Sequence, residues 1–160
     1  MRAVAGERLL LDELAPNPAF LLREHTVVDT PPQLVYDHIR RYRPDDRLVS
    51  TGWEVLGTRA GEQVVFGASA RFWTPLRHRH RISAEGWSAV WEPHLCGVVA
   101  GFTVLPYGGR TLLTCELHLT PEDPDAATGL RIYWHVLAPA VRILVHRALR
   151  DIGRGVAFRR

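Results

Sequence analysis

The chain has 160 residues, of which 46 % are hydrophobic and 23 % are charged. This composition is typical of a globular domain that buries its own core, and it excludes a disordered chain. The formal net charge is +3 and every one of the 20 Lys-or-Arg positions is Arg. Because these arginines are scattered, we expect no nucleic-acid-binding face.

Length and apolar patterning predict one domain over residues 1–160, since about 150 residues per domain is the usual prior. No apolar run approaches the roughly 18 residues of a membrane span. Charges at Glu7, Arg8 and Asp12 interrupt the start, which does not resemble a secretory signal. Cys96 and Cys115 lie in apolar, strand-like segments and predict buried, reduced thiols. We therefore expect a cytoplasmic protein.

The first half of the chain predicts a lead segment, a strand and a short helix. Within lead residues 1–20, Glu7–Leu14 has one apolar side and predicts a short helix that the following prolines end. Leu22–Val28 predicts a strand. The segment Thr30-Pro31-Pro32-Gln33 has the pattern of a capping box: the Thr30 hydroxyl is at the N-cap, a proline is at the first helical position and Gln33 is at the third. This pattern predicts that a short amphipathic helix begins here.

The middle of the chain predicts a run of antiparallel strands. Glycines at Arg59-Ala60-Gly61 and Tyr107-Gly108-Gly109 are typical of hairpin turns. The predicted strands are Gly52–Thr58, Gln63–Trp73, Ala84–Trp91, Leu95–Leu105 and Arg110–Thr120.

The last element is a long amphipathic helix over residues 125–155. Asp123-Pro124 supplies a cap and a helix-starting proline, and Pro139 inside the helix should kink it. Apolar residues recur at helical spacing and predict the covered side: Leu130, Tyr133, Trp134, Leu137, Val141, Leu144, Val145, Ala148 and Ile152. A second stripe should face water: Arg131, His135, Arg142, His146 and Arg150.

Several motifs resemble the START/Bet v 1-like (SRPBCC) superfamily, in particular its bacterial polyketide cyclase/dehydrase-like members. They are His25–Tyr36, Val64–Gly67 through Arg71–Trp73, Trp91-Glu-Pro93, Thr111–Glu116, and Arg131–Trp134 with Pro139. The resemblance implies an α+β helix-grip fold, in which a curved antiparallel sheet of about six or seven strands wraps around the long C-terminal helix. One or two short helices would follow the first strand. It also implies a hydrophobic pocket between sheet and helix.

The strand Arg110–Thr120 places Leu113, Cys115, Leu117 and Leu119 on one face and Glu116 and His118 on the other. One hypothesis makes Glu116 and His118 an acid/base pair that lines the pocket. The favoured alternative is that the leucine face is interior and the pair is solvated, since apolar-in and polar-out is usual for such a sheet.

Two more residues are candidates for chemistry. Arg71 has the donor geometry to anchor an acidic group, although a partner carboxylate at the rim is the commoner role. Tyr133 is the candidate pocket hydrogen-bond donor of the last helix, or else an interior phenol satisfied by a carbonyl. His78 and His80 lack a third ligand, so no metal is expected, and no phosphate loop or dinucleotide motif occurs, so no cofactor is expected.

The predicted inner surface is apolar, and Gly97 and Gly101 are expected to leave room beside it. The predicted pocket residues are Val64, Phe66, Phe72, Trp73, Trp91, Phe102, Val104, Leu113, Cys115, Leu117, Tyr133, Trp134, Leu137 and Val141. Apolar walls with few polar points suit small-molecule recognition. We therefore expect a binding protein for a hydrophobic small molecule: a lipid, a polyketide or an aromatic metabolite.

Two alternatives remain open, and a homodimer is compatible with each of them. The first is a polyketide cyclase/aromatase or dehydratase-type enzyme, in which positioning in the same cavity supplies much of the catalysis. The second is a non-catalytic regulatory module that acts through its arginine-rich exterior.

Overall fold

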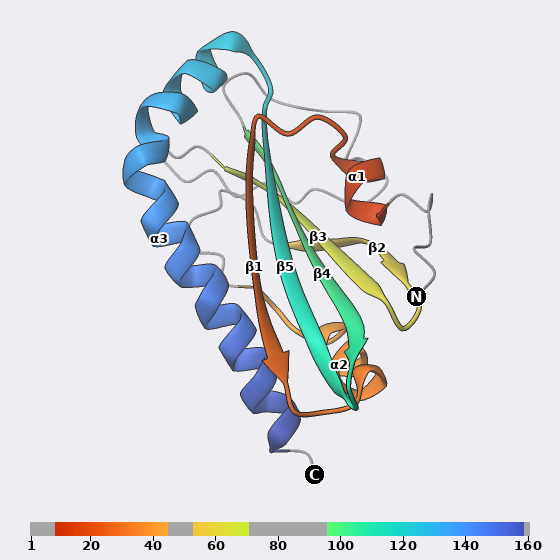
Figure 1. Cartoon of the computed structure of the whole chain (residues 1–160). Coiled ribbons are helices and arrows are strands. Elements are labelled where there is room, and N and C mark those ends of the chain that lie inside the picture. The colour runs from red at the N-terminus through yellow and green to blue at the C-terminus, as the bar shows by residue number, and fades with distance from the viewer. Residues whose placement is uncertain (1–8, 45–52, 71–95, 159–160) are drawn as a thin grey trace.

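The computed structural model describes residues 9–44, 53–70 and 96–158. Five antiparallel strands form one sheet in the order β1-β5-β4-β3-β2 (Figure 1). The strands are β1 (Phe20–Val28), β2 (Glu54–Arg59), β3 (Gln63–Ala70), β4 (Cys96–Tyr107) and β5 (Arg110–Pro121). Three helices accompany them: α1 (Leu10–Leu14), α2 (Pro32–Ile39) and α3 (Pro124–Ala157).

Glycine turns join the two hairpins, as the sequence predicted. Gly108 and Gly109 have φ values of 53° and 79°, and Tyr107 pairs with Arg110 around them. Two consecutive positive φ values define the mirror-image turns that match the twist of paired strands. Gly61, between β2 and β3, has a φ of 75°. Local turn chemistry therefore places both hairpin turns, and the β2–β3 pairing shifts its register further along, between Val55 and Gly57.

The sheet carries helices on both faces (Figure 1). α3 packs on β1 and β5, and α2 packs on β3, β4 and β5, over one face that we call the α3 face. α1 packs on β2, β3 and β4 from the opposite side, which we call the α1 face. Each face has its own apolar cluster, because the strands alternate their side chains between the faces. The short lead helix thus has a structural role that its sequence alone did not reveal.

The capping-box prediction at Thr30 is wrong. α2 begins at Pro32, its N-cap residue is Pro31, and no side chain caps it. Thr30 is buried instead, and its carbonyl accepts a 2.6 Å hydrogen bond from the Thr111 hydroxyl. Gln33 donates to Asp37 one turn further along the helix. A tertiary contact with β5 therefore replaces the local cap.

The predictions for the start and length of α3 are confirmed. The Asp123 carboxylate accepts a 2.7 Å hydrogen bond from the Ala126 N–H, and Pro124 occupies the first turn. The helix is 34 residues long and continues through Pro139. Although it is long, no stretch of it or of the other described helices is apolar enough to cross a bilayer.

The sheet confirms the α+β arrangement but corrects the predicted strand count. Within the described residues it has five strands, rather than six or seven. The predicted strand Ala84–Trp91 lies outside the described residues, as do the last three residues of the predicted strand Gln63–Trp73.

Candidate functional site

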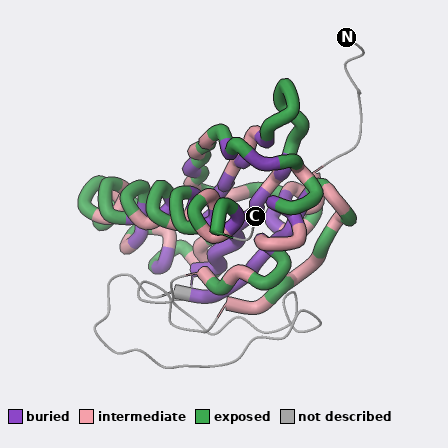
Figure 2. Tube along the Cα trace, turned by 90° about the horizontal axis from the view of Figure 1, so that it is seen from below, coloured by how far each residue is buried: buried purple, intermediate pink, exposed green. Residues whose placement is uncertain are grey.

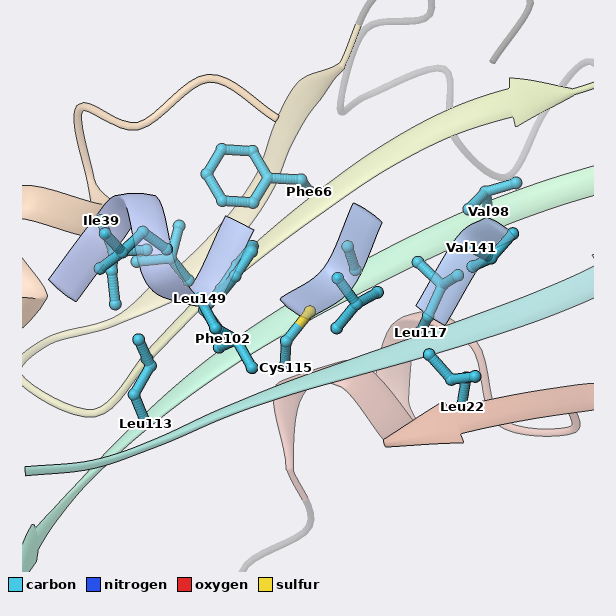
Figure 3. Packing of buried hydrophobic residues seen from close by; sticks show 14 of the residues in the cluster. Leu22, Ile39, Phe66, Val98, Phe102, Leu113, Cys115, Leu117, Val141 and Leu149 are labelled. Atoms are coloured by element: carbon cyan, nitrogen blue, oxygen red, sulfur yellow. The ribbon is translucent and has the colours of Figure 1, made fainter. Parts of the chain in front are cut away.

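The α3 face of the sheet is lined by apolar side chains, as predicted (Figure 3). The predicted pocket residues found in this buried cluster are Val64, Phe66, Phe102, Val104, Leu113, Cys115, Leu117 and Val141. Phe66 and Phe102 meet edge to face at 5.9 Å between ring centroids, an arrangement that aromatic pairs prefer. Phe72, Trp73 and Trp91 lie outside the described residues.

α3 covers this face unevenly. From Val141 onward it contributes a regular series of buried residues: Val141, Val145, Leu149, Ile152 and Val156. Residues 131–140 contain no fully buried side chain. Trp134, Leu137 and Ala138 are half-buried there, and the other residues of the stretch are exposed. Residues 131–140 are therefore the loosely packed part of the helix.

The pair Tyr133 and Trp134 was predicted to lie on the covered side of α3, and only Trp134 does. The Trp134 ring packs on Phe20 of β1 at 5.0 Å between centroids. Tyr133 is 44 % exposed, so it lies at the margin of the packed side. A phenol in this position is accessible to solvent and belongs to the loosely packed part of the helix.

Gly101 does not leave room on the α3 face, which corrects the sequence prediction. A Cβ atom at Gly101 would lie 3.1 Å from Cδ2 of Leu11, so the glycine admits the leucine of α1 on the opposite face. Gly97 shares that face by strand alternation, since it pairs with Ser69 and Thr120. The space that glycine creates therefore belongs to the docking of α1.

Glu116 and His118 form a hydrogen-bonded pair on the α1 face, with 2.7 Å between Glu116 Oε1 and His118 Nε2. Strand alternation turns them away from Leu117, so they do not line the apolar α3 face. They are also not solvated, since His118 is 2 % and Glu116 5 % exposed. The favoured prediction that the leucine face is interior is thus right, but its expectation that Glu116 and His118 are solvated is wrong. The pair is buried because α1 and the residues after it cover this part of the sheet.

The pair belongs to a larger polar network. His118 Nδ1 lies 3.0 Å from the carbonyl oxygen of Ala15, and Arg23 Nε of β1 donates to Glu116 Oε2 at 2.5 Å. Both ring nitrogens of His118 therefore have a hydrogen-bond partner, the Ala15 carbonyl at Nδ1 and the Glu116 carboxylate at Nε2. Burial by itself would raise the pKa of Glu116, but hydrogen bonds from Arg23 and His118 hold that pKa below its ordinary value.

Asp12, Glu116 and His118 bring ligand-type atoms within 4.8 Å of one another, and they are the described residues that could hold a cation. The two Glu116 oxygens and both His118 nitrogens are already engaged in hydrogen bonds. Arg23 also lies against this cluster and supplies positive charge to the Glu116 carboxylate. The arrangement is therefore better explained as a satisfied polar network than as a metal site.

Sequence analysis missed the partners of this network. Arg23 and Gln63 both point to the α1 face, and Gln63 accepts from the Leu10 N–H at 2.9 Å while donating to the Thr103 hydroxyl at 3.2 Å. The available signal was strand alternation, which places polar residues of several strands on one face. The alternation does not show that α1 covers this face, because that depends on where the lead helix docks.

The remaining candidates offer no nucleophile within the described residues. Burial raises the pKa of both cysteine thiols, Cys96 and Cys115, to about 12, and neither is in a disulfide. Ser69 is buried on the α1 face. Arg71, His78 and His80 lie outside the described residues.

No protein-family model and no curated protein matches the chain. Solved structures that resemble this chain include a protein from Arthrobacter aurescens, with 12 % sequence identity and a TM-score of 0.48. The alignment covers 97 % of this chain and 92 % of that protein. A protein from Chromobacterium violaceum has 13 % identity and a TM-score of 0.47, with 85 % and 96 % covered. The Zhui aromatase/cyclase from Streptomyces sp. R1128 has 9 % identity and a TM-score of 0.46, with 86 % and 95 % covered.

A polyketide aromatase/cyclase is thus among the solved structures that are similar to this chain.

Proposed function

We propose that this domain binds a hydrophobic small molecule between the α3 face of the sheet and residues 131–140 of α3. The supporting observation is the change in packing along the helix. Val141 and the residues after it are buried at regular spacing, whereas residues 131–140 contain no fully buried side chain. An apolar surface opposite a loosely packed helix segment is a place where an apolar ligand gains by burial.

The side chains nearest this segment define the chemistry of the ligand. Trp134 and Phe20 offer aromatic surface, and Leu22, Leu117 and Val141 are buried aliphatic residues of the same cluster. The charged residues Glu116 and His118 lie on the other face of the sheet. This composition favours a flat or elongated apolar molecule, with Tyr133 as a hydrogen-bonding group at the margin.

Filling the segment tests the proposal. A Leu137→Trp substitution adds bulk at a half-buried position, and Ile143→Trp adds similar bulk at a position that is 67 % exposed on the same helix. We expect the protein to bind the fluorescent apolar probe 1-anilinonaphthalene-8-sulfonate, and Leu137→Trp to weaken this binding at least about tenfold. Ile143→Trp should bind as the parent does. Equal affinities in all three proteins, or no binding by the parent, would contradict the proposal.

The cyclase or dehydratase alternative would use the same site and rests on the position of Tyr133. Of the four predicted catalytic residues, Glu116 and His118 face away from the apolar α3 face, and Arg71 lies outside the described residues. Tyr133 stands in the loosely packed segment and is 44 % exposed. If the domain is such an enzyme, Tyr133→Phe should change the product ratio from a poly-β-keto substrate, while His118→Gln should not.

A further inference from the structure

The outward side of α3 carries a continuous stripe that changes from apolar to basic along the helix. Ile132, Val136 and Ile143 are 66 %, 74 % and 67 % exposed. At 3.6 residues per turn they lie within an arc of about 60° that also contains three exposed arginines further along: Arg147, Arg150 and Arg154. Figure 2 shows α3 exposed along this side.

The charge of the exposed side is strongly one-sided. From residue 131 to residue 158 the charged side chains are five arginines and one aspartate, Asp151, which gives a net charge of +4. The Glu24 carboxylate of β1 lies 2.8 Å from Arg142 and 3.3 Å from His146. The charge of Arg142 is therefore partly neutralised by Glu24. The basic half of the stripe, residues 147–154, retains a surplus of positive charge next to the apolar half.

We propose that this stripe docks the domain on an anionic lipid surface. The exposed side chains stand on a convex helix about 40 Å long over residues 131–158, so a rigid partner would have to supply a matching groove. A lipid surface deforms around protruding Ile and Val side chains, and its headgroups supply the negative charge that complements Arg147, Arg150 and Arg154. Nucleic acid would match the arginines but would leave the apolar half of the stripe unused.

Co-sedimentation of the full chain with lipid vesicles tests the proposal. We expect binding to phosphatidylcholine vesicles that contain a third phosphatidylserine, little binding to pure phosphatidylcholine, and a marked loss at high salt. The triple variant R147Q/R150Q/R154Q should bind about 100-fold more weakly, at about fivefold per arginine. I132S/V136S/I143S should weaken binding several-fold. The matched controls R110Q and L34S change exposed residues elsewhere and should bind as the parent does.

The opposite results overturn the proposal. Equal binding to neutral and anionic vesicles, no binding to either, or unchanged binding by the arginine variant would each do so. Binding to DNA or to poly-glutamate that the same variants abolish, without vesicle binding, would assign the stripe to another partner. Because Leu137→Trp leaves the stripe intact, it should retain vesicle binding, which separates this test from that of the small-molecule site.

Discussion

Replacing Glu116 by glutamine tests the polar network beneath α1. The carboxylate accepts one hydrogen bond from buried His118 and one from Arg23, whose side chain is 57 % exposed. Hydrogen bonds to charged groups contribute about 1.5–3 kcal/mol, and the Arg23 contribution must be reduced to about 0.5 kcal/mol for solvent screening. Glutamine retains one neutral bond to His118, of about 1 kcal/mol. The expected loss in the free energy of unfolding at pH 7 is therefore about 2 kcal/mol.

Urea denaturation measures this loss, and its dependence on pH gives the sharper test. With a slope of about 2 kcal/mol per molar, the midpoint should fall by about 1 M. The pKa of Glu116 is lowered in the folded protein, so the ionised carboxylate stabilises the fold at pH values above the ordinary carboxyl pKa. This contribution is lost as the pH falls through the pKa that Glu116 has in the folded protein. The difference between parent and Glu116→Gln should thus shrink progressively as the pH falls below the ordinary carboxyl pKa, because the lowered folded pKa of Glu116 is then reached.

Glu122→Gln is the matched control, since burial, followed by the charge of Asp123, raises the pKa of Glu122. A carboxyl group whose pKa is raised in the folded protein lowers the free energy of unfolding at neutral pH. Glu122→Gln should therefore cause no loss in the free energy of unfolding at neutral pH. A Glu116→Gln protein as stable as the parent at neutral pH, or equally destabilised at neutral and acidic pH, would refute the assigned network.

Three further predictions concern packing and reactivity. In the same urea assay, Gly101→Ala should lower the free energy of unfolding by about 1 kcal/mol, because the added Cβ atom would press on Leu11 of α1. Gly153→Ala should raise the free energy of unfolding by about 0.5–1 kcal/mol, because the added Cβ atom makes only ordinary contacts and alanine favours a helix over glycine. Leu149→Ala should lower the free energy of unfolding by about 2–5 kcal/mol and Ile143→Ala by less than about 0.5 kcal/mol; similar losses would contradict the assigned sides of α3. The Cys115 thiol should react with a disulfide reagent at mildly alkaline pH only after unfolding, and rapid labelling of the native protein would contradict its burial.

Features that depend on neighbours in the sequence were predictable. Gly108 and Gly109 identified the hairpin turn, Asp123 with Pro124 identified the start of α3, and the alternation along β5 identified its apolar face. Each depends on the backbone preferences of a few adjacent residues or on the fixed period of an element.

Features that depend on a distant segment were not predictable. Thr30 has the pattern of a capping residue, but its carbonyl is bonded by Thr111, 81 residues away. Gly101 was expected to leave space on one face, and the position of Leu11 assigns that space to the other.

The sequence by itself determined which side chains share a face of each element, because the strand and helix periods are properties of the backbone. Only the tertiary structure decided whether a face meets water or another element. For Glu116 and His118, burial depends on where α1 docks, and that docking results from the combined contacts of several strands with one short helix. No local pattern contains that information.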